Sequence, residues 1–117
     1  ETESEFYRCK MAFTLKQNDT SPQIAAILQD GDGTAIDLTA ATVKFHMKKV
    51  GAATATTDAA ATVIDANAGS VKYVWTSNDT AIAGSYLAEF EVTYTDGGIE
   101  TFPNDESIAI LITEDLA

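Results

Sequence analysis

Apolar and polar residues alternate along most of this chain. Six segments place an apolar side chain at every second position, within residues 13–15, 24–28, 43–47, 71–75, 86–94 and 108–112. Successive side chains of a β-strand point to opposite faces of its sheet, so a period of two predicts strands with one buried face. The pattern predicts half-buried strands throughout the chain.

Short polar segments rich in Gly, Asp and Asn separate these strands. The sequences QDGDG (29–33), ANAGS (66–70) and TDGG (95–98) contain residues that tolerate the positive backbone angles of tight turns. Residues 51–63, rich in Ala and Thr, are expected to form a hairpin or loop that leads into a strand at residues 62–65, and only residues 76–83 could form a helical turn. This organisation predicts an all-β fold, an immunoglobulin-like antiparallel β-sandwich of about seven to eight strands.

The first ten residues differ in composition from the rest of the chain. Residues 1–10 are mostly polar and are predicted to form an N-terminal arm or extension, whereas residues 11–117 suffice for a single domain with one core. Phe6 and Tyr7 are adjacent rings that a strand-like arm would point to opposite sides. They are candidate interface residues, either against a neighbouring subunit or on the chain's own edge strand.

The segment from residue 77 to residue 98 contains a pattern typical of a sandwich crossover. In immunoglobulin-like sandwiches, a tyrosine near the start of a late strand bonds through its hydroxyl to the backbone a few residues upstream. Tyr86 fits this role, with Asp79 predicted to cap the preceding turn and Gly84 to permit a close bend. Phe90 and Trp75 are predicted to pack in the core.

The charge balance excludes some classes of partner. The chain has 18 acidic and 7 basic residues, which gives a formal net charge of −11. This field repels phosphate backbones and anionic lipid headgroups, so neither nucleic acid nor a membrane surface is expected as a partner. The acidic residues are scattered, which is typical of a solubilising surface.

No group of residues indicates catalysis or metal binding. His46 is the only histidine, and its position beside Lys44 and Lys48 predicts that it points to solvent. Cys9 is the only cysteine, so a zinc site or a histidine-activated nucleophile would need unusual partners. Catalytic residues, cofactors and metal ligands are therefore not expected, and the protein is not expected to be an enzyme.

The sequence DGDG at residues 30–33 resembles the start of a calcium-binding loop. The next ligand positions are occupied by Thr34 and Ile36, and no glutamate closes the loop. The segment is predicted to be a turn.

One aromatic residue suggests an alternative function. Phe102 precedes Pro103 at a strand end, where exposure of its ring is expected, and Asn104 and Asp105 follow with polar side chains. An exposed ring beside amide and acid groups could bind a sugar. The alternative hypothesis is a carbohydrate-binding module that adheres to a host glycan, with these three residues as the candidate interface.

A family resemblance extends from about Phe13 to Ile112. It rests on Lys16, residues 19–22, residues 37–39 with Ala41, Trp75, Asp79, Gly84, Tyr86, Glu89, Phe90, residues 96–97 and residues 100–105. These residues resemble the β-sandwich domain at the N-terminus of the baseplate upper protein of lactococcal phages, a domain also found in small phage virion proteins.

The resemblance implies a structural protein of a bacteriophage virion. Such a protein would dock or connect components of the particle, either in tail, baseplate or fibre attachment or as a head or neck decoration. Its expected partners are other virion proteins, with copies of itself as a further candidate, and no catalytic activity is expected.

Overall fold

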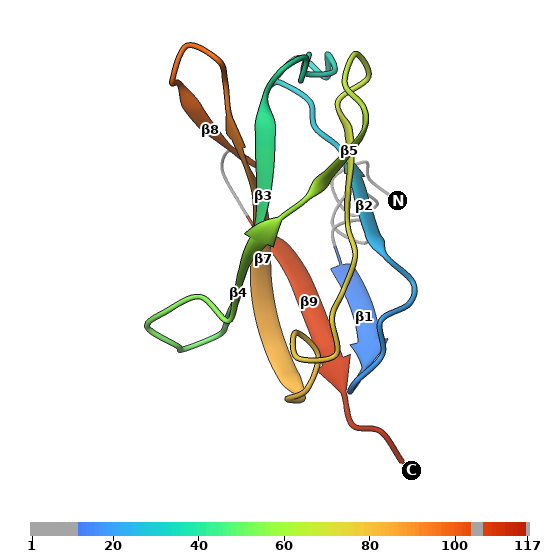
Figure 1. Cartoon of the computed structure of the whole chain (residues 1–117). Coiled ribbons are helices and arrows are strands. Elements are labelled where there is room, and N and C mark those ends of the chain that lie inside the picture. The colour runs from blue at the N-terminus through green and yellow to red at the C-terminus, as the bar shows by residue number, and fades with distance from the viewer. Residues whose placement is uncertain (1–11, 104–106, 117) are drawn as a thin grey trace, which may run out of the picture.

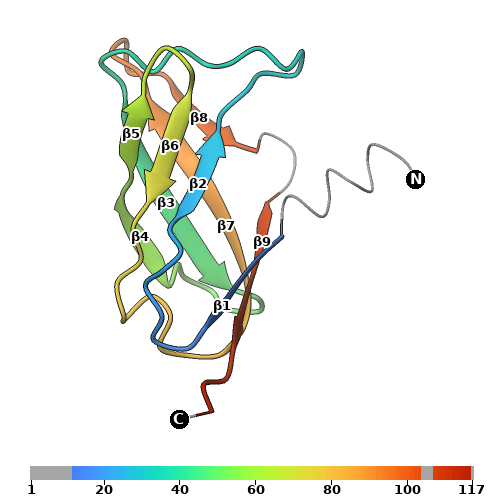
Figure 2. The same ribbon diagram turned by 90° about the vertical axis from the view of Figure 1, so that its right-hand side faces the viewer.

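Two β-sheets pack face to face (Figures 1 and 2). The computed structural model describes residues 12–103 and 107–116, and these residues form nine strands. The larger sheet has the order β1 (Ala12–Lys16), β9 (Ile108–Thr113), β7 (Gly84–Thr93), β3 (Thr42–Lys49) and β4 (Thr57–Ala60), and β8 (Ile99–Phe102) also pairs with β7. The smaller sheet has the order β2 (Ile24–Ile27), β6 (Ser70–Tyr73) and β5 (Thr62–Asp65).

Strand β7 organises the larger sheet. One of its edges pairs with β3 along eight residues, and the other edge pairs first with β9 and then with β8. Strand β1 runs parallel to β9, whereas the remaining named strand pairs are antiparallel. The N-terminal and C-terminal strands therefore lie side by side, as Figure 1 shows.

An aromatic cluster fills the space between the sheets. Phe45 on β3 and Phe90 on β7 are fully buried and lie opposite each other in register. The Phe45 ring stacks on Tyr73 of the smaller sheet, with centroids 4.5 Å apart, and meets Trp75 edge-on at 5.5 Å. Stacked and edge-on geometries are the favourable ones for aromatic rings, so this cluster holds the two sheets together.

Beside this cluster lies a buried carboxylate. Asp79 accepts hydrogen bonds from the Thr57 hydroxyl at 2.9 Å, the Tyr73 hydroxyl at 2.6 Å and the Thr76 amide at 2.8 Å. Thr57 belongs to β4 and Tyr73 to β6, so the carboxylate connects the two sheets as well as the turn that precedes it. Among the described residues, no buried side-chain nitrogen or oxygen lacks a hydrogen-bond partner.

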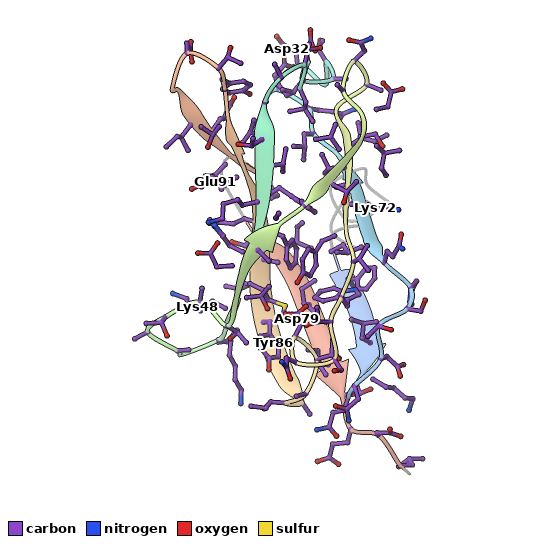
Figure 3. All side chains as sticks on the ribbon, in the orientation of Figure 1. Asp32, Lys48, Lys72, Asp79, Tyr86 and Glu91 are labelled. Atoms are coloured by element: carbon purple, nitrogen blue, oxygen red, sulfur yellow. The ribbon has the colours of Figure 1, made fainter. Side chains whose placement is uncertain are left out.

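The predicted crossover tyrosine bonds to the backbone upstream. The Tyr86 hydroxyl donates to the carbonyl of Ile82 at 2.6 Å, and the ring is 2% exposed. Gly84 has a φ of 152°, and a Cβ there would lie 2.9 Å from Lys49 Cε, so this bend favours glycine. Figure 3 shows Asp79 and Tyr86 toward the same end of the molecule, far from Asp32.

The all-β sandwich predicted from the period of two is confirmed, with nine strands instead of seven or eight. The expected strand at residues 62–65 is β5. The Ala- and Thr-rich segment before it also contains β4, which the sequence did not indicate because residues 57–60 lack apolar alternation. Residues 76–83 form turns and bends, and no helix in the described part of the chain is long and apolar enough to cross a membrane.

Truncation of Phe90 to alanine should destabilise the domain severely. Phe90 is 0% exposed, so Phe90→Ala removes a buried ring and should lower the free energy of unfolding by about 3 to 5 kcal/mol. Urea denaturation followed by tryptophan fluorescence measures this loss. Leu87→Ala, on the same strand but 44% exposed, is the control and should cost far less; equal losses would contradict the burial assigned to β7.

Removal of the Tyr86 hydroxyl tests the crossover bond. Tyr86→Phe keeps the buried ring but leaves the Ile82 carbonyl without its donor, so the free energy of unfolding should fall by about 0.5 to 1.5 kcal/mol. An unchanged urea midpoint would mean that Tyr86 contributes only as a core aromatic.

The shifted pKa values of two tyrosines predict that the folded protein loses stability at alkaline pH. Burial, followed by the hydrogen bond to Asp79, raises the pKa of Tyr73, and burial, followed by the bond to Glu100, raises the pKa of Tyr94 to about 12. The folded state therefore retains protons that the unfolded chain releases near pH 10. The contribution of these tyrosines to the free energy of unfolding should be fully present below pH 10 and should fall as the pH rises toward 12. Urea midpoints between pH 8 and pH 12 measure this; a flat profile would contradict it.

Candidate interaction surface

The residues predicted to be structural lie in the interior. Asp79, Tyr86, Phe90 and Trp75 are all buried, and the Trp75 indole donates a hydrogen bond to the Pro22 carbonyl at 3.1 Å. They support the fold and leave the outer faces of the sheets as the surfaces available for contact.

The candidate interface predicted from the sequence is only partly described. Phe102 is 3% exposed and pairs with Phe90 across β7 and β8, so the expectation of an exposed ring was wrong. The register of this pairing places Phe102 on the same inward face as Phe90. Phe6, Tyr7, Asn104 and Asp105 lie outside the described residues.

The acidic turn and the histidine have structural partners. Asp30 accepts hydrogen bonds from the amides of Asp32 and Thr34, which is a turn geometry. His46 is half-buried on β3, where its Nε2 lies 3.2 Å from Asp58 and its Nδ1 lies 3.8 Å from Glu89. Within residues 12–103 and 107–116, no group of three or more His, Cys, Asp or Glu residues could hold a metal ion.

The outer face of the larger sheet contains a patch without charged side chains. In one row across the strands, Thr14 pairs with Leu111 and Leu111 with Ser85. In the next row Ala109 pairs with Leu87. The neutral patch consists of these five exposed residues together with Val50, whose amide donates to the Ser85 carbonyl: Thr14, Val50, Ser85, Leu87, Ala109 and Leu111.

Charged residues border the neutral patch. Lys48 pairs with Leu87 on the neighbouring strand, and Lys44 bonds to Asp58 at 2.8 Å. The hydrogen bond from Lys44 holds the pKa of Asp58 below its ordinary value and raises the pKa of Lys44. Figure 3 shows Lys48 and Glu91 on this side of the molecule and Lys72 on the opposite side.

A shallow hollow of about 370 Å³ lies where the neutral patch meets the charged residues. Leu87, His46, Asp58 and Glu89 are among its lining residues. An apolar centre with a charged margin is the arrangement of a protein interface, in which the centre is desolvated and the rim stays hydrated. The alternation of apolar residues identifies inward-facing positions and did not predict this surface. Its signal in the sequence is the outward-facing Leu87 and Leu111 of an acidic chain.

The comparisons with known proteins agree with this fold. The chain is similar over 87% of its length to the N-terminal domain of phage TP901-1 ORF48, with a TM-score of 0.61, 17% sequence identity and 84% of that chain covered. At this identity the likeness shows the fold. No curated protein matches the chain.

The family match covers most of the chain. Residues 9–103 match the family described as the BppU N-terminal domain. This confirms the family resemblance noted from the sequence, with the match ending at residue 103 and the expected resemblance extending to Ile112. The chain therefore belongs to the family of N-terminal domains of phage baseplate upper proteins and is a structural component of the virion.

Proposed function

We propose that this chain is a non-enzymatic docking module that joins one virion protein to another through the neutral patch. The observation that supports the proposal is the clustering of exposed Leu87 and Leu111, each 44% exposed, on an uncharged face of a chain with a net charge of −11. Outward-facing strand positions on an acidic protein would ordinarily share its charge. An uncharged face can be desolvated without burying unpaired ions.

The occupant of the neutral patch is a different virion protein and not a second copy of this chain. Two copies would each bring a net charge of −11 to the contact, and like charges oppose such an association. The hollow is lined by Lys48 as well as by Asp58 and Glu89, so a partner with an apolar centre and a rim of both charge signs would complement it. Self-association is an outcome that the experiment below distinguishes.

Membership in the baseplate family favours a place in the tail. The proposed partner is a baseplate or fibre-attachment protein, and a head or neck decoration is the alternative location. Residues 11–117 are proposed to form the docking domain, with residues 1–10 as an arm that precedes it.

The carbohydrate-binding alternative loses the observation that motivated it. Its sugar platform required an exposed Phe102, which is buried. Among the residues that the structure describes, every aromatic side chain is buried or half-buried. Asn104 and Asp105, the polar members of that hypothesis, are not described.

An aspartate in the neutral patch should prevent docking without unfolding the domain. Leu111→Asp introduces a charge that must be desolvated on binding, so incorporation into particles should fall by about tenfold or more. Complementation with the variant, followed by mass spectrometry of purified particles, measures the copy number. Circular dichroism and the urea midpoint should remain close to those of the unchanged protein.

The matched control is Ile64→Asp on β5. Ile64 is 54% exposed and belongs to the smaller sheet, so the same charge is added at a similar exposure on the opposite layer of the sandwich. Normal incorporation of Leu111→Asp, or equal loss with Ile64→Asp, would overturn the assignment of the neutral patch. Light scattering of the purified chain tests self-association, since a dimer dissociated by Leu111→Asp would favour a second copy as the occupant.

A further inference from the structure

The outer face of the smaller sheet carries exposed aliphatic side chains. Ile27 on β2 is 60% exposed, Ile64 on β5 is 54% exposed, and Val74, directly after β6, is 47% exposed. Single exposed aliphatic residues are normal on a protein surface, but several on one face are typical of a contact site. The aliphatic face consists of the outward-facing residues of these strands: Ala25, Ile27, Thr62, Ile64, Ser70, Lys72 and Val74.

Lys72 lies at the centre of the aliphatic face. It belongs to β6, the middle strand, and pairs with Ala25 of β2 on one side and with Thr62 of β5 on the other. Because side chains two positions apart share one face of a strand, Ser70 and Val74 flank Lys72 along β6. The ammonium group of this face therefore stands among apolar and hydroxyl-bearing neighbours.

No carboxylate of the described residues forms an ion pair with Lys72. The ion pairs found in this part of the chain involve Lys44 and His46. Asp65, at the end of β5, pairs with Ser70 in the adjacent row and not with Lys72. A cation without a partner is unexpected on a chain with 18 acidic and 7 basic residues.

A protein that covers the aliphatic face must bring a carboxylate to Lys72. Contact with Ile27 and Ile64 removes water from these side chains and from the ammonium group between their strands. A charge that loses its water without gaining an opposite charge opposes binding, whereas a hydrogen-bonded carboxylate compensates it. The complementary surface is therefore apolar, with an Asp or Glu near its centre.

This requirement argues against a second copy of the chain as the occupant. A twofold contact between two aliphatic faces would bring the Lys72 ammonium groups of both copies together, and like charges oppose such a contact. The neutral patch of another copy has no carboxylate to offer, since its members are uncharged. A different protein fits the face better.

The aliphatic face and the neutral patch point in opposite directions. They are the outer faces of the two sheets, and the hydrophobic core lies between them. Figure 3 shows Lys72 on the opposite side of the molecule from Lys48, which borders the neutral patch. A chain that is docked through the neutral patch therefore presents its aliphatic face to a further component.

We propose that the aliphatic face binds a second virion protein, one that presents an apolar surface with a carboxylate opposite Lys72. The chain then links two components of the particle, one at each outer face of the sandwich. This linking role rests on the proposed docking at the neutral patch, whereas the contact at Lys72 does not depend on it.

Zero-length cross-linking of purified particles tests the contact at Lys72. A carbodiimide joins an amine to a carboxylate that touches it, so mass spectrometry should recover Lys72 linked to an Asp or Glu of another virion protein. The matched control is Lys72→Arg, which keeps the charge but lacks the amine and should lose the cross-linked peptide. Cross-links from Lys72 only to copies of this chain, or to no protein, would overturn the proposal.

Charge reversal tests whether the contact holds the second protein. In Lys72→Glu particles the copy number of the cross-linked protein should fall by about tenfold or more, while this chain stays at its normal copy number. Ile64→Asp should act in the same way, and Lys72→Arg should retain the second protein. Circular dichroism should show all three variants folded. Retention of the second protein by Lys72→Glu would overturn the proposal, as would loss of this chain itself.

Leu111→Asp separates this inference from the proposed function. Loss of the chain from Leu111→Asp particles, together with the Lys72 cross-link in unchanged particles, would support both. Normal incorporation of Leu111→Asp would overturn docking at the neutral patch, and the Lys72 cross-link would still decide whether the aliphatic face is a contact.

Discussion

The buried carboxylate of Asp79 is the contact on which the arrangement of the two sheets depends. Its oxygens accept from Thr57 in the larger sheet and from Tyr73 in the smaller one. The Tyr73 ring, fixed at its hydroxyl, stacks on Phe45, the residue at the centre of the aromatic cluster. Without the carboxylate, two hydroxyl groups in the interior would lack an acceptor, and the alignment of the stacked rings would lose its polar constraint.

The inside and outside of the larger sheet serve different purposes. Alternation along β7 buries Tyr86, Phe90 and Val92 while it presents Leu87 to solvent. The inward set forms the core between the two sheets and so stabilises the sandwich. The outward set does not contribute to this core, so proteins can share the fold and differ at these positions.

Local sequence patterns were enough to predict the strands. Contacts between residues far apart in the sequence could not be predicted from them. The period of two located β7 and β9, and the spacing of Tyr86 from the preceding turn predicted its bond to the backbone upstream. Thr57 could not be identified as a partner of Asp79, because it lies 22 residues away in a segment without alternation. The neighbouring Pro103 led to the prediction that the Phe102 ring is exposed. Pairing of β8 with β7 instead directs this side chain into the core.

The parallel pairing of β1 and β9 has a mechanical consequence. The chain enters β1 at one end of this pair and leaves β9 at the other, as Figure 1 shows. Tension applied between a segment before Ala12 and a segment after Thr113 would pull along the strand axes and load all five paired positions in shear. Bonds loaded together resist more force than bonds opened one after another. The β1–β9 pairing would therefore resist a pull along the strand axes better than a pair of strands whose bonds open in sequence.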